Sequence, residues 1–190
     1  MIGCSSSNSG DNKETTTELE TNEETANEEQ NSKEDELEVD ESDLGKMTIY
    51  KTNTDLNLVQ RSGPFIVKIL GSRLFTFEPS EDTKFMFDNK DKVTVITLHV
   101  EVENTSEETY TIYPNQGTIV TNTKEQVDCH IWLSEEVGGD FIGQVIKKGD
   151  INFILDSDPE KIKSVKYIIS GPRNRNFDII GEDIIFELSF

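Results

Sequence analysis

Apolar and polar side chains alternate in five separate runs of this chain, and this two-residue period constrains the fold more than any other feature. Successive side chains of a β-strand point to opposite faces of a sheet, whereas an α-helix repeats about every 3.6 residues. Each run therefore predicts a strand that buries one face and exposes the other. The alternating apolar residues are Phe65, Val67 and Ile69; Ile96, Leu98, Val100 and Val102; Ile151, Phe153 and Leu155; Val165, Tyr167 and Ile169; and Ile184, Phe186 and Leu188.

Residues that favour turns separate these runs, as at Gly63-Pro64 and Gly171-Pro172. The strongest helix candidate is a short turn within residues 79–91. Several short strands with one polar face each predict an all-β fold, an antiparallel β-sandwich. About 145 residues are enough for one such domain with its own core, and we expect it to span residues 46–190.

Two pairs of motifs resemble a known family. Gly63–Ile69 is followed by Val93–Thr105, whose V-x-V-x-N pattern places Asn104 where the chain turns, and Gly143–Gly149 is followed by the apolar run Ile151–Leu155. These motifs resemble an immunoglobulin-like domain of unknown function from surface lipoproteins of Bacillus-like Gram-positive bacteria. The resemblance covers residues 60–190 and implies an immunoglobulin-like sandwich, similar to the fold of the mycobacterial secreted immunoprotective antigen. It implies no catalytic residues and no cofactor.

The chain before this domain is strongly acidic. Between Asp11 and Asp43 there are fifteen Asp and Glu residues and two Lys, and the whole chain has a formal net charge of −20. This segment has no aromatic residue, so it cannot bury enough apolar surface to offset the entropy of ordering. We expect a disordered acidic linker that ends at residue 45. A helix is the alternative, since Glu favours helices, but the Thr and Asn residues weaken it.

The chain begins Met1-Ile2-Gly3-Cys4-Ser5. A small residue before a cysteine is what a bacterial lipoprotein signal peptidase requires, and the cysteine thiol carries the lipid. We therefore interpret residues 1–45 as a lipobox remnant followed by the linker, with Cys4 as the site of lipid attachment. A lipobox also needs an upstream apolar segment, so we expect the precursor to begin before Met1. The alternative is an ordinary N-terminus with a chance cysteine.

Three potential metal ligands lie on one predicted strand. His99, Glu101 and Glu103 are spaced two apart, so they share a face and could meet a divalent cation. The same pattern is typical of a solvated sheet face. We expect these three side chains to face solvent or the rim of the sheet, while Leu98 and Val100 face the core.

Other candidate residues lie in predicted loops and short strands. Cys129 and His130 are adjacent, so a regular strand would point them to opposite faces, and we expect Cys129 to be a buried or idle thiol without a disulfide partner. Trp132 is expected in the core or at its rim, with ligand stacking as the alternative. Phe85–Asp91 offers three oxygen-bearing residues for calcium but lacks the spacing of an EF-hand. Phe85, Met86 and Phe87 either cap the core or form an exposed apolar tip.

These observations predict a binding or interaction module without catalytic residues, held by a lipid on the extracytoplasmic face of the cell membrane. The expected partners are the membrane, through acylated Cys4, and a protein or another envelope ligand. The acidic charge excludes nucleic acid, which needs a basic surface. The alternative function is a metal-binding or metal-delivery protein of the cell envelope that uses His99 or His130.

Overall fold

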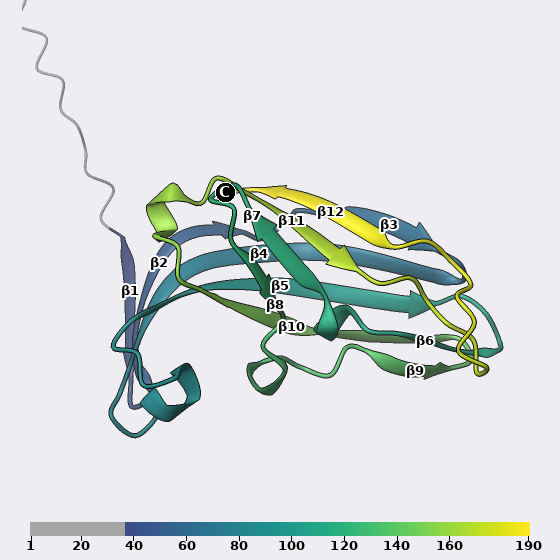
Figure 1. Ribbon diagram of the computed structural model, residues 1–190, viewed down its shortest axis with the longest axis horizontal. Coiled ribbons are helices and arrows are strands. Elements are labelled where there is room, and N and C mark those ends of the chain that lie inside the picture. The colour runs from purple at the N-terminus through teal and green to yellow at the C-terminus, as the bar shows by residue number, and fades with distance from the viewer. Residues whose placement is uncertain (1–36) are drawn as a thin grey trace, which may run out of the picture. The chain divides into compact units, whose positions relative to one another are not determined.

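The computed structural model describes residues 37–190, which fold into β-strands joined by turns and short 3-10 helices (Figure 1). The all-β, antiparallel fold predicted from the two-residue period is confirmed. The strands are β1 (Glu38–Ser42), β2 (Gly45–Asn53), β3 (Leu58–Ser62), β4 (Phe65–Pro79), β5 (Val93–Asn104), β6 (Thr109–Ile112), β7 (Thr118–Thr121), β8 (Gln126–Asp128), β9 (Gly139–Ile142), β10 (Val145–Leu155), β11 (Ser164–Ile169) and β12 (Ile184–Ser189). The 3-10 helices are η1 (Lys84–Phe87), η2 (Pro114–Gln116), η3 (Ile131–Leu133) and η4 (Pro159–Lys161).

One sheet has six strands in the order β1-β2-β4-β5-β10, and β3 pairs with the first part of β4. A second sheet has the order β12-β11-β7-β8, and β6 and β9 form a separate two-stranded ribbon. Every pair of strands is antiparallel. The long strand β5 is paired along both edges, because β4 flanks one side and β10 the other.

The hydrophobic core lies between the two larger sheets. All five predicted runs supply it, and the alternating apolar residues of each run are buried. Aromatic side chains join the layers: the rings of Phe153 on β10 and Tyr167 on β11 lie 5.6 Å apart at 70°. Tyr167 is fully buried, and its hydroxyl donates a 2.6 Å hydrogen bond to the carbonyl of Pro114. A buried tyrosine therefore keeps its polar atom satisfied.

A β-bulge divides β4 into two halves. The register of β4 against β5 shifts between Ile69 and Gly71. Before the bulge, odd-numbered residues such as Val67 face the core; after it, even-numbered residues such as Leu74 do so. One extra residue exchanges the two faces of a strand, so Arg73 comes to lie on the face of the sheet that points away from the core.

Asn104, at the end of β5, ties together the chain segments that meet there. Its side-chain amide donates to the carbonyls of Glu108 and Gly143, both at 2.9 Å, and to that of Phe141 at 3.3 Å. Its side-chain oxygen accepts a hydrogen bond from the backbone N–H of Ser106. The residue is fully buried, which fits the sequence interpretation that Asn104 turns the chain.

The ordered strands begin earlier than the predicted boundary at residue 46. β1 starts at Glu38 and pairs with β2 from Glu38↔Ile49 to Ser42↔Gly45. All five residues of β1 are exposed, so main-chain pairing with β2, and not burial of side chains, holds this strand. Cys4 and the linker up to residue 36 lie outside the described residues. The segment predicted to contain a helical turn, residues 79–91, contains η1.

Val100→Ala should lower the free energy of unfolding by about 1–3 kcal/mol, because Val100 is fully buried at the centre of β5 and its loss leaves a cavity. Val59→Ala is the matched control, since Val59 lies exposed on β3 and a surface change costs within about 0.5 kcal/mol. Denaturant melts of both variants measure the difference. Equal losses would contradict the assignment of the core.

Candidate functional site

The face of the six-stranded sheet that points away from the core carries the candidate site, and we call it the outer face. β4, β5 and β10 supply its centre, where residues that pair across strands share a face. The register brings Arg73 beside Thr97 and Thr97 beside Asn152, and it brings Gly71 beside His99 and His99 beside Asp150. Positions far apart in the sequence thus form one polar surface.

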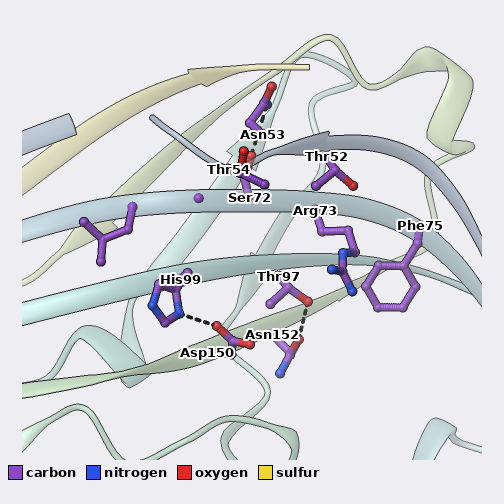
Figure 2. A pocket seen from close by; sticks show the side chains of 12 residues that line it. Thr52, Asn53, Thr54, Ser72, Arg73, Phe75, Thr97, His99, Asp150 and Asn152 are labelled. Atoms are coloured by element: carbon purple, nitrogen blue, oxygen red, sulfur yellow. Dashed lines mark hydrogen bonds and ion pairs between the residues drawn. The ribbon is translucent and has the colours of Figure 1, made fainter. Parts of the chain in front are cut away.

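A groove of about 400 Å³ lies on this surface, and we call it the outer groove. Figure 2 shows its side chains. The lining residues are Thr52, Asn53, Thr54, Leu70, Gly71, Ser72, Arg73, Phe75, Thr97, His99, Asp150 and Asn152. Gly71 forms part of the floor, and a side chain there would collide with the carbonyl oxygen of Asn53, 2.8 Å from the position of a Cβ. The bulge in β4 and this glycine together keep the floor open.

Two polar pairs cross the outer groove (Figure 2). Nδ1 of His99 lies 2.7 Å from Oδ1 of Asp150, and the hydroxyl of Thr97 donates a 2.6 Å hydrogen bond to Oδ1 of Asn152. Arg73 is exposed and makes no ion pair with any carboxylate of residues 37–190. A guanidinium group always carries its charge in proteins and donates in a planar fork. The groove therefore offers a ligand a guanidinium group that pairs with no carboxylate of residues 37–190.

An apolar hollow of about 300 Å³ adjoins the outer groove, and Phe75 and Asn152 line both. Its walls come from strands β1, β2, β4, β5 and β10 and from the two short helices η1 and η3. The apolar residues among its lining are Leu44, Met47, Phe75, Phe77, Phe87, Val95 and Leu133. The ring centroids of Phe77 and Phe87 lie 5.2 Å apart. The outer face thus changes from polar to apolar along a single strand, β4.

Glu101 corrects the sequence prediction for this face. The alternation predicts a side chain that faces solvent or the rim, but Glu101 is only 7% exposed. Oε2 lies 2.5 Å from Nζ of Lys148 on β10, and Oε1 lies 2.6 Å from Nζ of Lys68 on β4. Hydrogen bonds from these ammonium groups, that of Lys148 first, hold the pKa of the Glu101 carboxyl below its usual range. Side chains of both neighbouring strands therefore cover a carboxylate that the alternation alone placed in solvent.

The predicted metal ligands do not come together as a site. His99 pairs with Asp150, Glu101 with two lysines, and Glu103 lies further along the strand. In the segment Phe85–Asp91, which lacks the spacing of an EF-hand, the Asp91 carboxylate pairs with Lys84 at 2.6 Å. Within residues 37–190, no group of three or more His, Cys, Asp or Glu side chains is arranged to hold a metal ion.

Cys129 and His130 follow the end of β8 and lie outside any strand, so the expectation for a regular strand does not apply to them. Cys129 is a free, buried thiol whose sulfur lies 3.2 Å from the hydroxyl of Ser134, and burial raises its pKa. His130 instead lines a hollow near Asp128 and Asp156, and its Nδ1 is buried without a hydrogen-bond partner among residues 37–190. The thiol and the imidazole therefore do not form a nucleophile and base.

The aromatic residues of η1 and η3 are divided between surface and interior. Trp132 is 91% exposed, which overturns the expected place in the core. The short η3 turn places it outward while the neighbouring Leu133 packs against the apolar hollow. Phe85 and Met86 are exposed and Phe87 is buried. The segment therefore combines the two alternatives, since Phe85 and Met86 form an exposed apolar tip and Phe87 packs inside.

Sequence reasoning missed the residues that define the outer groove, above all Arg73, Phe75 and Asn152. Arg73 and Phe75 follow the bulge in β4, where the alternation changes phase. The local signal that could have found them is Gly71, since a glycine inside a strand pattern often marks a bulge. Nothing local in the sequence predicts that Asn152 lies beside Thr97.

Comparisons with known proteins find a relative by sequence and a solved structure with a similar fold. No family model matches the chain. Over 97 residues, half of this chain, the sequence is 27% identical to the SPbeta prophage-derived uncharacterized lipoprotein YonS of Bacillus subtilis strain 168. The match covers 48% of YonS, so the chain spans about half the length of this relative.

Among solved structures, a functionally unknown protein from Listeria monocytogenes EGD-e superposes with a TM-score of 0.58 at 13% identity. The superposition covers 76% of this chain and 88% of that chain, so the two share a fold. None of the helices within residues 37–190 has the length and apolar character needed to cross a membrane.

Glu101→Gln should lower the free energy of unfolding by about 1–2 kcal/mol at neutral pH, because it weakens two charge-assisted hydrogen bonds at a covered site. The folded-state pKa of Glu101 is lowered, so its contribution is complete above the ordinary Glu pKa of about 4.3 and is lost as the pH falls through the lowered value.

Glu103→Gln is the matched control, since this carboxylate makes no ion pair with another of the described residues. Urea melts of the three proteins between pH 7 and pH 2.5, roughly the range over which carboxylates titrate, measure the effect. A loss for Glu101→Gln that persists unchanged at the acid end would show that the charge is not responsible.

Proposed function

We propose that the chain is a non-catalytic binding module, held by a lipid on Cys4 at the extracytoplasmic face of the cell membrane. Support for the anchor comes from Gly3-Cys4 and from the relative YonS, which is named a lipoprotein. A long acidic segment between Cys4 and β1 suits a spacer between a membrane and a folded domain. The net charge of −20 makes electrostatic adhesion of the protein to anionic lipid unfavourable. The acyl chain on Cys4 would therefore have to hold the protein at the membrane.

The proposal includes an immunoglobulin-like arrangement of the sandwich. In such folds, strands A, B and E share one sheet, and strands G, F and C share the other. The orders β4-β5-β10 and β12-β11-β7 correspond to these two sets, and β8 adds a strand beside β7. This correspondence supports the predicted subtype. The fold hosts many functions, so the site must carry the functional argument.

The observation that carries the binding function is the continuity of the outer groove with the apolar hollow. A ligand that covers both would place an apolar part against Phe75 and Phe77 and an anionic group near Arg73. Binding sites in proteins combine apolar walls with polar groups that fix orientation, and here the hollow supplies the apolar walls and the groove the polar groups. We therefore propose an amphipathic ligand with an acidic group.

The absence of catalysis is part of the proposal, and the state of Cys129 argues against a cysteine nucleophile. Burial raises the pKa of Cys129, so the thiol stays protonated at neutral pH, and a thiol must ionise to attack. The described partner of its sulfur is a serine hydroxyl, not a base. His99, the histidine of the outer groove, pairs with the Asp150 carboxylate and not with a hydroxyl or thiol nucleophile of the described residues.

The anionic dye 1-anilinonaphthalene-8-sulfonate should bind the folded full-length chain saturably, with a rise in fluorescence as its rings enter the apolar hollow. Arg73→Gln should weaken this binding about 10-fold, because a hydrogen bond to a charged group contributes about 1.5 kcal/mol or more. A fluorescence titration at neutral pH, with near-ultraviolet circular dichroism to confirm that the chain is folded, measures both constants.

Two controls isolate the charge at the groove. Arg61→Gln removes an exposed arginine from β3, outside the groove lining, and should leave dye binding unchanged. The neutral dye N-phenyl-1-naphthylamine has the same rings without the sulfonate, so its binding should not depend on Arg73. If both arginine variants weakened the anionic dye equally, or if no saturable binding occurred, the proposed ligand site would be wrong.

In a Gram-positive host that exports and acylates it, the chain should partition into the detergent phase, and Cys4→Ser should move it to the aqueous phase. The physical reason is that a diacylglycerol supplies two acyl chains, which give stable anchoring, whereas residues 37–190 contain no spanning helix. Ser5→Ala, beside the lipid site, is the matched control and should leave partitioning unchanged. Equal membrane retention of Cys4→Ser would contradict the proposed anchor.

A further inference from the structure

Phe177 lies in the connection between β11 and β12, which Figure 1 shows, and its backbone conformation is unusual for its residue type. Its φ angle is +67°, in the left-handed region, and its side chain is 78% exposed. A bulky residue rarely adopts this conformation, because its Cβ crowds the backbone. Such strain persists only where the surroundings fix it, and it concentrates at functional positions.

Asn174 fixes the loop that presents Phe177. Its backbone N–H donates to the carbonyl of Asp178, and the N–H of Phe177 donates back to the carbonyl of Asn174. The Asn174 side-chain oxygen accepts from the N–H groups of Asn176 and Asp178 at 2.9 and 3.0 Å. The loop is thus held in its shape before any partner arrives, which lowers the entropy that binding would cost.

The loop carries two arginines without carboxylate partners. Arg173 donates to the carbonyl of Phe177, and Arg175 donates to the hydroxyl of Thr109, so both bond neutral oxygens. Among residues 37–190, neither guanidinium group forms an ion pair. In a chain with 38 acidic and 18 basic residues, two arginines of one loop that form no ion pair need an explanation.

Charges of the opposite sign lie beside them, also without ion pairs. A hollow of about 390 Å³ is lined by Glu107 and Glu108 on one side and by Asn174, Arg175 and Asn176 on the other. Neither glutamate forms an ion pair with the described residues. One end of the sandwich therefore presents a protruding aromatic ring, a hollow and free charges of both signs.

Exposed aliphatic residues enlarge this surface. Ile179, two residues after Phe177, is 67% exposed, and Ile142 is 77% exposed. Ile142 pairs with Thr109, whose hydroxyl accepts the hydrogen bond from Arg175. We call the loop 173–179, together with Glu107, Glu108 and Ile142, the Phe177 patch. Contiguous exposed apolar residues rimmed by charges are typical of interaction sites.

We propose that the Phe177 patch is an interface between two copies of this chain, related by a two-fold axis. A two-fold interface uses the same patch on both copies, so the patch must complement itself. Here Phe177 of one copy enters the hollow of the other, and Arg175 of each copy meets Glu107 and Glu108 of its partner. The pairing excludes water from the three apolar side chains of each patch.

The mixture of charges in the Phe177 patch favours a second copy of this chain over a purely acidic or a purely basic partner. An acidic partner would approach Glu107 and Glu108 as well as the arginines, and a basic partner would approach Arg173 and Arg175 as well as the glutamates. A second copy of this chain offers Arg175 two glutamates and offers those glutamates an arginine. This inference is independent of the ligand proposed for the outer groove.

Sedimentation velocity of the full-length chain should reveal a dimer whose population rises with concentration. We expect a dissociation constant below roughly 1 mM, and weaker self-association would not support the proposal. Phe177→Asn should raise the dimer dissociation constant at least about 30-fold, the effect of removing a central aromatic residue from an interface. Asparagine tolerates the left-handed conformation, so the melting temperature should not fall. Trp132→Ser, which removes an exposed aromatic residue from η3, is the matched control and should not change the dimer.

Charge reversal gives a second, sharper test. One variant carries Arg175→Glu, and the other carries both Glu107→Lys and Glu108→Lys. Each variant by itself should be monomeric, because like charges then face one another. An equimolar mixture of these two variants should dimerise, since both contacts of the mixed pair are attractive. A wild-type chain that stays monomeric to about 1 mM, equal loss with Trp132→Ser, or a mixture that remains monomeric would overturn the proposal.

Discussion

Pairing along both edges of β5 is the constraint on which the rest of the structure depends. Because β4 and β10 saturate its backbone groups, the strand cannot slip, and each of its side chains is assigned to one face. Leu98, Val100 and Val102 then build the core, while Thr97 and His99 must line the outer groove. The core and the candidate site are two faces of a single strand, so stability and site geometry are set together.

The sequence predicted the long, half-buried strands well and the short or exposed ones poorly. Five runs with a strict two-residue period became β5, β10, β11, β12 and the first half of β4, because burial of one face leaves a periodic signal. β1 has no such signal: its residues are all exposed and mostly acidic. A strand held by main-chain pairing at a sheet edge has the composition of a linker, and β1 therefore lies inside the segment predicted as a linker.

The candidate site was less predictable than the fold because it is assembled from residues distant in sequence. The neighbours of His99 are Gly71 and Asp150, and strand register, which no local pattern encodes, selects both. Glu101 shows the same limit. Alternation placed its carboxylate on the outer face correctly, but only the flanking positions of Lys68 and Lys148 decide that it is covered and paired. Long-range partners, not residue type, determine the environment of such side chains.

The bulge at Ile69 and Gly71 gives β4 an unequal tolerance to two kinds of genetic change. Substitutions that keep the size and polarity of a side chain leave both halves of the strand in phase with β5. A single-residue deletion near Leu70 would remove the extra residue and rotate one half by a face, turning Leu74 outward and Arg73 inward. A deletion in β4 should therefore disturb the outer groove more than such a substitution does, because the number of residues in the strand decides which side chains face outward.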